Sequence, residues 1–179
     1  MYKRQNLLLH SENYNDAYWV KSSSTIFNNI IVAPDGSLTG DKFVINNGVS
    51  SSSSAIRTDL TKSASPVEYT LTVYAKTSEY PILRLLPRDP ALATNTADAR
   101  FDLVAGTVVS TTVSGTYTNA SARIRHVGNG WYRCSVTFTT GSETSLRPQF
   151  LMLGSGGAVT GNGSVSYTHL RAHETKANL

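Results

Sequence analysis

Few residues of this chain could do chemistry, and their spacing matches no common catalytic site. His169 and His173 lie four residues apart, the spacing of two ligands on one face of a helix, and imidazole suits zinc. The sequence contains no HExxH motif, no P-loop lysine and no G-x-S-x-G nucleophile turn. Asp98 and Asp102 could form the carboxylate pair of a glycosidase, but many other pairs in the chain could do so equally well. We therefore predict that the chain is not an enzyme and has no catalytic residue.

Both ends of the chain look like translated sequencing adapter. The codons GTG TAT AAG AGA CAG encode residues 1–5, and their reverse complement, read in a shifted frame, encodes residues 165–168. This inverted repeat resembles the transposon end that is used to fragment DNA for sequencing, and residues 169–175 resemble the adapter beyond it. We assign residues 1–5 and 164–179 to adapter-derived scars, and residues 6–163 to the natural domain.

This assignment removes most of the basic character of the chain. The sequence has sixteen Lys and Arg and twelve Asp and Glu. Four of the basic residues and one acidic residue lie in the scars, which leaves twelve against eleven and a net charge of +1. We therefore predict no nucleic-acid partner. With His169 and His173 in a scar we also predict no metal site and no cofactor, while a structural calcium ion is left open. No apolar run approaches the roughly 18 residues that span a membrane, so we predict no membrane partner.

The composition is typical of extracellular or virion β-structure. Only 16% of the residues are charged, compared with about a quarter in average globular proteins, and Ser, Thr, Asn and Gly take their place. Cys134 is the single cysteine, so the chain has no internal disulfide. It lies in the alternation Tyr132, Cys134, Val136, Phe138, which predicts a buried and unreactive thiol.

Apolar and polar residues alternate with a period of two over most of the natural domain. The alternation is clearest in Glu68–Lys76 and Trp131–Thr139. Shorter segments of the same kind are 41–46, 54–58, 82–86, 100–103, 122–126 and 149–153. Asn129-Gly130 predicts a type I′ hairpin turn, because both residues tolerate positive φ. Only residues 11–19 could form a helical turn, and the serine run at residues 50–54 predicts a solvated loop. These features predict an all-β fold, an antiparallel two-sheet β-sandwich of the jelly-roll type.

The alternation also predicts which side chains are buried and which face outward. The predicted buried set is Tyr69, Leu71, Val73, Phe101, Tyr132, Val136 and Phe138. The predicted outward set is Tyr74, Trp131, Arg84, Arg88, Arg100, Arg123, Arg125, Arg133 and Arg147. Aromatic rings pack on the C–H patches of sugars, and guanidinium groups donate paired hydrogen bonds to their oxygens. We predict the ligand-binding residues to be Trp131, Arg133, Tyr74 and Arg84. The alternative is that these arginines are solvated and paired with surface acids.

Four motifs early in the chain and one late motif carry a resemblance to a known family. They are Asn6-Leu-Leu-Leu-His-Ser-Glu12, Trp19-Val-Lys21, Ala33-Pro-Asp-Gly36, Asp41-Lys42 and Val127-Gly-Asn-Gly-Trp-Tyr-Arg133. In this order they resemble the carbohydrate-binding-module-like jelly-roll domains of phage tail fibres, head spikes and other virion appendages. The resemblance covers nearly all of residues 6–163. It implies a sandwich used for display, attachment or trimer packing, without catalysis.

The chain departs from this family at its C-terminal side. Domains of this kind continue after the Gly-rich turn into a closing strand, whereas residues 161–163 lead into the scar. We therefore expect the closing strand to be lacking and an edge of the sandwich to be unpaired. We also expect residues 1–5 and 165–179 not to pack as parts of the sandwich.

The predicted function is a noncatalytic, carbohydrate-binding-type module of a phage virion appendage. Its partners would be host surface polysaccharide or other virion subunits, and the family is compatible with a homotrimer in the intact protein. One alternative is a binding module attached to a secreted polysaccharide-degrading enzyme, which would place it outside the cell. The other is a purely structural interaction domain of the virion that has no glycan ligand.

Overall fold

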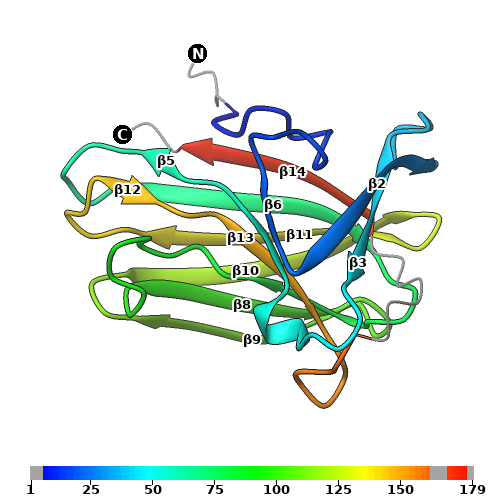
Figure 1. The fold of residues 1–179 in the computed structure, drawn as a ribbon. Coiled ribbons are helices and arrows are strands. Elements are labelled where there is room, and N and C mark those ends of the chain that lie inside the picture. The colour runs from blue at the N-terminus through cyan, green and yellow to red at the C-terminus, as the bar shows by residue number, and fades with distance from the viewer. Residues whose placement is uncertain (1–5, 162–168, 177–179) are drawn as a thin grey trace.

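The computed structural model describes residues 6–161 with their side chains and the backbone of residues 169–176. This part of the chain consists of β-strands and one short 3-10 turn, η1 (Ser51–Ser53), and has no α-helix. Figure 1 shows the strands as a layered structure. Their bounds are β1 Val20–Ser22, β2 Ser24–Ile31, β3 Gly40–Ile45, β4 Ala55–Arg57, β5 Leu60–Thr61, β6 Glu68–Lys76, β7 Ile82–Leu85, β8 Thr96–Asp102, β9 Thr107–Ser114, β10 Thr118–Gly128, β11 Trp131–Thr139, β12 Ser145–Leu146, β13 Gln149–Leu153 and β14 His169–Lys176.

Two six-stranded sheets form the sandwich. The first, which we call the β13 sheet, has the strand order β1-β4-β13-β7-β8-β9. The second, the β11 sheet, has the order β10-β11-β6-β14-β3-β2, and β12 and β5 form a separate pair. The paired strands run antiparallel. The predicted antiparallel β-sandwich is therefore confirmed.

The core lies between the two sheets and follows the predicted alternation. Six of the seven residues predicted to be buried are at most 4% exposed: Tyr69, Leu71, Val73, Phe101, Val136 and Phe138. The seventh, Tyr132, is partly buried and packs against the same cluster. Side chains of β6 and β11 meet those of β7, β8 and β13 in this cluster. The register of both long strands is therefore as the sequence predicts.

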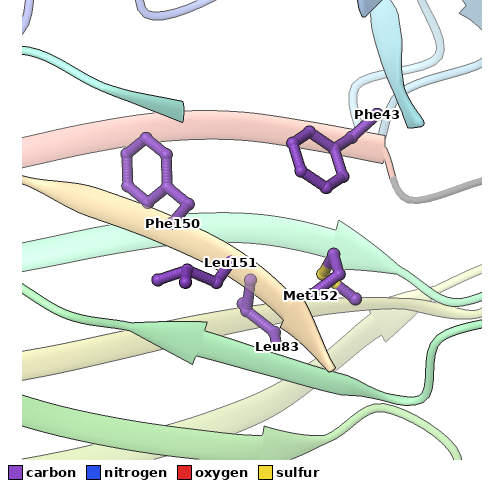
Figure 2. Close-up of a pocket in the computed structure, with 5 residues that line it drawn as sticks. All are labelled: Phe43, Leu83, Phe150, Leu151 and Met152. Carbon is purple, nitrogen blue, oxygen red and sulfur yellow. The ribbon is translucent and has the colours of Figure 1, made fainter. Parts of the chain in front are cut away.

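The centre of the core is closely packed. Figure 2 shows a small space bounded by Phe43 of β3, Leu83 of β7, and three successive residues of β13, Phe150, Leu151 and Met152. The space leaves about 0 Å³ for a water molecule. It is therefore part of the packing between the sheets and not a ligand site.

The hairpin between β10 and β11 turns at the predicted position. Asn129 has a φ of 51° and Gly130 a φ of 77°. Positive φ at both central residues is what a type I′ turn requires, and an Asn-Gly pair adopts it at low cost. The turn fixes the pairing of β10 with β11, in which Arg125 lies opposite Arg133.

The segment assigned to the C-terminal scar differs from expectation. Residues 169–176 form β14, which pairs with β6 from His169 opposite Lys76 to Lys176 opposite Tyr69. The same strand pairs with β3 at its start, so the edge that we expected to be unpaired is filled (Figure 1). The expectation that residues 165–179 stay outside the sandwich is therefore wrong for 169–176. The physical reason is that the pairing uses backbone groups, which any extended segment supplies. Residues 1–5 and 165–168 lie outside the described residues.

Two smaller expectations are also corrected. The serine run at residues 50–54 is not a solvated loop, because Ser51 and Ser54 are fully buried. The hydroxyl of Ser54 donates to the carbonyl oxygen of Ser23 at 2.9 Å. Because Ser23 connects β1 to β2, this bond holds the end of η1 against that connection. Residues 11–19 form a series of turns and no helix.

Candidate functional site

The four residues predicted to bind a ligand lie on two opposite faces of the molecule. Tyr74 of β6 and Arg133 of β11 are direct cross-strand neighbours on the outer face of the β11 sheet. Trp131 precedes Arg133 by two positions and has the same orientation on that strand. Arg84 lies on β7 and belongs to the outer face of the other sheet. The four side chains therefore do not form one face, because the strand order separates β7 from β6 and β11.

Trp131 is not the exposed platform that we predicted, since only 1% of it is accessible. It is on the outer side of its strand, as the alternation requires, but the backbone at Val32 and at Gly40 lies against it. The indole Nε1 donates a hydrogen bond to the carbonyl oxygen of Val32 at 3.1 Å. A Cβ added at Gly40 would lie 3.4 Å from the indole ring, so glycine lets the backbone approach it closely. Trp131 therefore fastens the loop to the sheet and is not available to a ligand.

The loop that covers Trp131 also forms one wall of an open pocket. Pro34, Asp35, Tyr74 and Val127 line this pocket, which has a volume of about 310 Å³. We call it the Tyr74 pocket. Hydrogen bonds within the loop fix its shape, since the amide of Ala33 donates to the carbonyl of Ser37 at 2.8 Å. The pocket is therefore a preformed feature that combines a half-buried phenol ring with a carboxylate.

The chemistry around the Tyr74 pocket suits a saccharide. The ring of Tyr74 offers an apolar face with a polar end, and the Asp35 carboxylate accepts hydrogen bonds from the amide and hydroxyl of Ser37 at 3.0 and 2.6 Å. Arg133, next to Tyr74, is exposed and has no hydrogen bond or ion pair with another described residue. Its guanidinium donors can therefore be used by a ligand.

Arg84 has a different environment, because its donors are occupied. Its Nε and Nη2 donate to the two carboxylate oxygens of Asp98 at 3.0 and 2.7 Å. Arg100 also lies 3.6 Å from Asp98. Asp102 accepts instead from the amides of Val104 and Ala105 and stabilises the turn after β8. Asp98 and Asp102 thus have separate structural partners.

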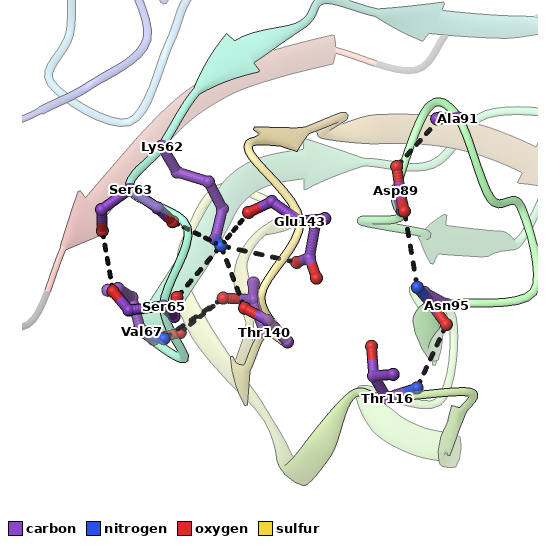
Figure 3. Close-up of polar contacts among 11 residues, drawn as sticks. Lys62, Ser63, Ser65, Val67, Asp89, Ala91, Asn95, Thr116, Thr140 and Glu143 are labelled. Atoms are coloured by element: carbon purple, nitrogen blue, oxygen red, sulfur yellow. Dashed lines mark hydrogen bonds and ion pairs between the residues drawn. The ribbon is translucent and has the colours of Figure 1, made fainter.

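A buried lysine that no sequence pattern indicated lies at the end of the sandwich near β5 and β12. The side chain of Lys62 is 1% exposed, and its Nζ lies 3.8 Å from Oε1 of Glu143. Nζ donates to the carbonyl oxygens of Ser63 at 2.9 Å, Ser65 at 3.1 Å and Gly141 at 3.0 Å, and to that of Glu143 (Figure 3). One buried ammonium group is thus the shared hydrogen-bond donor to these four carbonyl oxygens.

Three other features could carry function in the described residues: the single cysteine, clusters of metal-ligating side chains and membrane-spanning helices. Cys134 is fully buried, and burial raises the pKa of its thiol well above the usual range, so the predicted unreactive environment is confirmed. Within residues 6–161 no group of three or more His, Cys, Asp or Glu is arranged to hold a metal ion. The described part of the chain also contains no helix that is long and apolar enough to cross a membrane.

Comparisons with known proteins give a likeness of fold. No protein-family model matches the sequence, and no curated protein matches it. Among solved structures, the chain is similar to the enzymatically active domain of tailspike protein 4 of bacteriophage CBA120, with a TM-score of 0.51 and 11% sequence identity. The match covers 96% of this chain and 21% of that one, so the chain spans about a fifth of its neighbour's length. At this identity, the likeness shows the fold alone.

Proposed function

We propose that this domain is a noncatalytic saccharide-binding module of a phage virion appendage. The Tyr74 pocket carries the proposal, because its lining combines an aromatic ring and a carboxylate in one open site, and the exposed Arg133 lies opposite Tyr74 on the neighbouring strand. The virion setting is supported by the tailspike neighbour, whose fold this chain shares over 96% of its length. We propose host surface polysaccharide as the ligand.

Each group of the pocket has a defined part in this binding. The ring of Tyr74 packs on the C–H face of a sugar ring, an interaction that needs no charge on the ligand. Asp35 accepts hydrogen bonds from sugar hydroxyl groups. Arg133 donates to ring or hydroxyl oxygens from the neighbouring strand. Because the pocket is open and about 310 Å³ in volume, it accommodates a terminal or internal sugar unit while the rest of the polymer stays in solvent.

The test is a titration with fragments of host surface polysaccharide, selected first on a glycan array. We expect Tyr74→Ala to weaken binding about tenfold, which corresponds to about 1.4 kcal/mol. Tyr74→Phe keeps the ring and should retain most of the affinity. Arg133→Ala should also weaken binding, whereas Arg123→Ala should have no effect, because Arg123 is an exposed arginine on the same face but opposite Ser135.

Two results would count against the proposal. If the folded Tyr74→Ala variant binds as tightly as the parent protein, the Tyr74 pocket is not the site. If the intact domain binds no glycan of the array, the structural interaction domain becomes the better account. Circular dichroism of each variant controls for loss of the fold.

A further inference from the structure

The outer face of the β13 sheet, opposite the Tyr74 pocket, carries a second group of polar residues. In the register of this sheet, Arg57 lies opposite Gln149, and Leu151, Arg84 and Arg100 follow one another across β13, β7 and β8. Beyond the ends of β7 and β13, the backbones of Arg88 and Arg147 pair in the same way. Because alternate residues of a strand share a face, these positions point the same way. We call this group the arginine face: Arg57, Arg84, Arg88, Arg100 and Arg147.

The arginine face has an excess of positive charge. Asp98 lies beside Arg84 and Arg100, and Asp59 receives two hydrogen bonds from Arg147 at 2.6 and 2.8 Å. The bonds from Arg147 lower the pKa of Asp59, so this carboxylate is ionised at neutral pH. Asp102 lies two positions along β8 from Arg100 on the same face. Five guanidinium groups and three carboxylates give this face a formal charge of +2.

Two of the five arginines have no counter-ion of their own. Among the described residues, neither Arg57 nor Arg88 makes a side-chain hydrogen bond or an ion pair. The carboxylates of Asp59 and Asp98 are already engaged by Arg147 and Arg84. Desolvation, followed by repulsion from Arg147 and Arg57, lowers the pKa of Arg88, which shows how closely these charges are gathered.

The face is also partly removed from water, which makes the unused polar groups costly. Ala55, Leu86 and Leu151 form a buried apolar floor beneath the arginines. The Nε atoms of Arg88 and Arg100 are buried without a hydrogen-bond partner. Gln149 is only 7% exposed, and its Oε1 atom is also buried without a hydrogen-bond partner. A buried donor or acceptor that lacks a partner is unfavourable, so a ligand that supplies the partner is bound more tightly.

We propose that the arginine face is a second ligand site, which binds an oxyanion (carboxylate, sulfate or phosphate) carried by an acidic saccharide. The oxyanion accepts from the free donors of Arg57, Arg88 and Arg100, in the paired geometry that guanidinium groups favour. Sugar hydroxyl groups next to it donate to Gln149 and bind the hydroxyls of Ser110 and Thr112, which lie across from Arg100 and Asp98 on β9. The saccharide part of this inference rests on the proposed function, whereas the oxyanion part rests on the arginine face alone.

The experiment has two arms. In the first, inorganic phosphate is titrated into the protein and the Nε–Hε signals of its arginines are followed by NMR; we expect those of Arg88 and Arg100 to shift. In the second, binding is measured to oligomers of galacturonate, of mannuronate and of a sulfated galactan, each alongside its carboxyl-reduced or desulfated counterpart of the same length. We expect at least one acidic oligomer to bind at least tenfold more tightly than its neutral counterpart.

Matched variants locate the site. The double variant Arg57→Gln/Arg88→Gln should weaken binding of the acidic oligomer at least tenfold. It leaves the bidentate pairs of Arg84 and Arg147 intact, so the fold should be unchanged. The double variant Arg123→Gln/Arg125→Gln removes the same charge from the other sheet and should have little effect. Equal weakening by both doubles would mean that net charge alone attracts the ligand and would overturn the inference.

The remaining outcomes separate this site from the Tyr74 pocket. Equal affinity for the acidic and neutral oligomers would overturn the inference and leave the proposed function intact. Phosphate-induced shifts without binding of any acidic oligomer would contradict the saccharide part. If neither phosphate nor any acidic oligomer binds, the oxyanion site is wrong, and sensitivity of neutral-glycan binding to Tyr74→Ala would still uphold the proposed function.

Discussion

At the scale of single residues, Lys62 illustrates how one buried charge can organise two loops. Its side chain is 1% exposed, and its ammonium group donates to the carbonyl oxygens of Ser63, Ser65, Gly141 and Glu143. Replacing it with an apolar side chain of similar length would leave these oxygens and the Glu143 carboxylate without their common partner. Such unsatisfied buried groups are expensive, since breaking a buried pair by removing one partner costs about 3–5 kcal/mol.

We therefore expect Lys62→Met to lower the free energy of unfolding by about 3 kcal/mol or more, measured by urea denaturation. Lys21→Met is the matched control, because Lys21 also donates to two carbonyl oxygens, at 2.9 and 3.1 Å, but at the surface. It should cost less than about 1 kcal/mol. Equal losses in the two variants would mean that the environment of Lys62 is not as the structure shows.

Trp131 has a structural role that separates it from the binding residues around it. The indole is 1% exposed and donates a hydrogen bond to the carbonyl oxygen of Val32. We expect Trp131→Ala to destabilise the fold by about 3–5 kcal/mol, as is typical of a buried aromatic residue. Trp131→Phe, which keeps a ring but loses the donor, should cost about 1 kcal/mol for the hydrogen bond, plus a packing loss. Thermal unfolding monitored by circular dichroism measures both; a Trp131→Ala protein as stable as the parent would contradict the burial.

At the scale of elements, β14 shows that a segment can become a strand because neighbouring strands offer it backbone groups to pair with. β6 offers a full row of backbone groups, and β14 pairs with it at eight successive residue positions. Removing residues 165–179 would expose that edge of β6 and the start of β3. We now expect this deletion to lower the free energy of unfolding by more than about 2 kcal/mol and to promote association through the open edge. Denaturant titration together with light scattering measures both effects. A monomeric deletion variant of unchanged stability would show that β14 contributes nothing to the sandwich.

The elements that were predictable from the sequence are those with one face on the core. β6 and β11 show a clean alternation because Leu71, Val73, Val136 and Phe138 meet the opposite sheet. β9 has no such alternation, since it is an edge strand whose valines 108, 109 and 113 are exposed. β2 is also irregular, because Asn29 has a φ of 55° and the pairing with β3 shifts between Phe27 and Ile31. Local patterning therefore predicts the strands that build the core and misses the edge strands β2 and β9, although it does find part of the edge strand β10.

The candidate site was only partly predictable, for reasons that are also physical. The direction of Tyr74, Arg133 and Arg84 follows from the parity of each strand, and all three do face away from the core. The sheet to which each strand belongs depends on contacts between distant segments, so it was not evident that Arg84 lies opposite the other two. The burial of Trp131 depends on a loop about a hundred residues earlier in the chain, which the pattern of its own strand does not encode.

At the scale of the whole molecule, the sandwich presents two unlike outer faces to solvent. The face of the β11 sheet bears the Tyr74 pocket, in which an aromatic ring and a carboxylate lie side by side. The face of the β13 sheet bears the arginine face, whose excess charge is +2. A polysaccharide that reaches both would contact the module on two sides, whereas a short oligomer would occupy one. Binding at the arginine face should weaken with salt, because it is electrostatic, and binding at the Tyr74 pocket should not.

The most direct test of the central claim is to map the bound saccharide on the protein by NMR. A ¹⁵N-labelled sample is titrated with the oligosaccharide that binds best on the array, at a salt concentration that screens the arginine face. We predict saturable shifts of the backbone amides of Tyr74, Arg133 and Asp35, while those of the β13 sheet stay in place. Saturable shifts confined to another part of the surface, or none at all with any host glycan, would contradict the claim that the Tyr74 pocket binds saccharide.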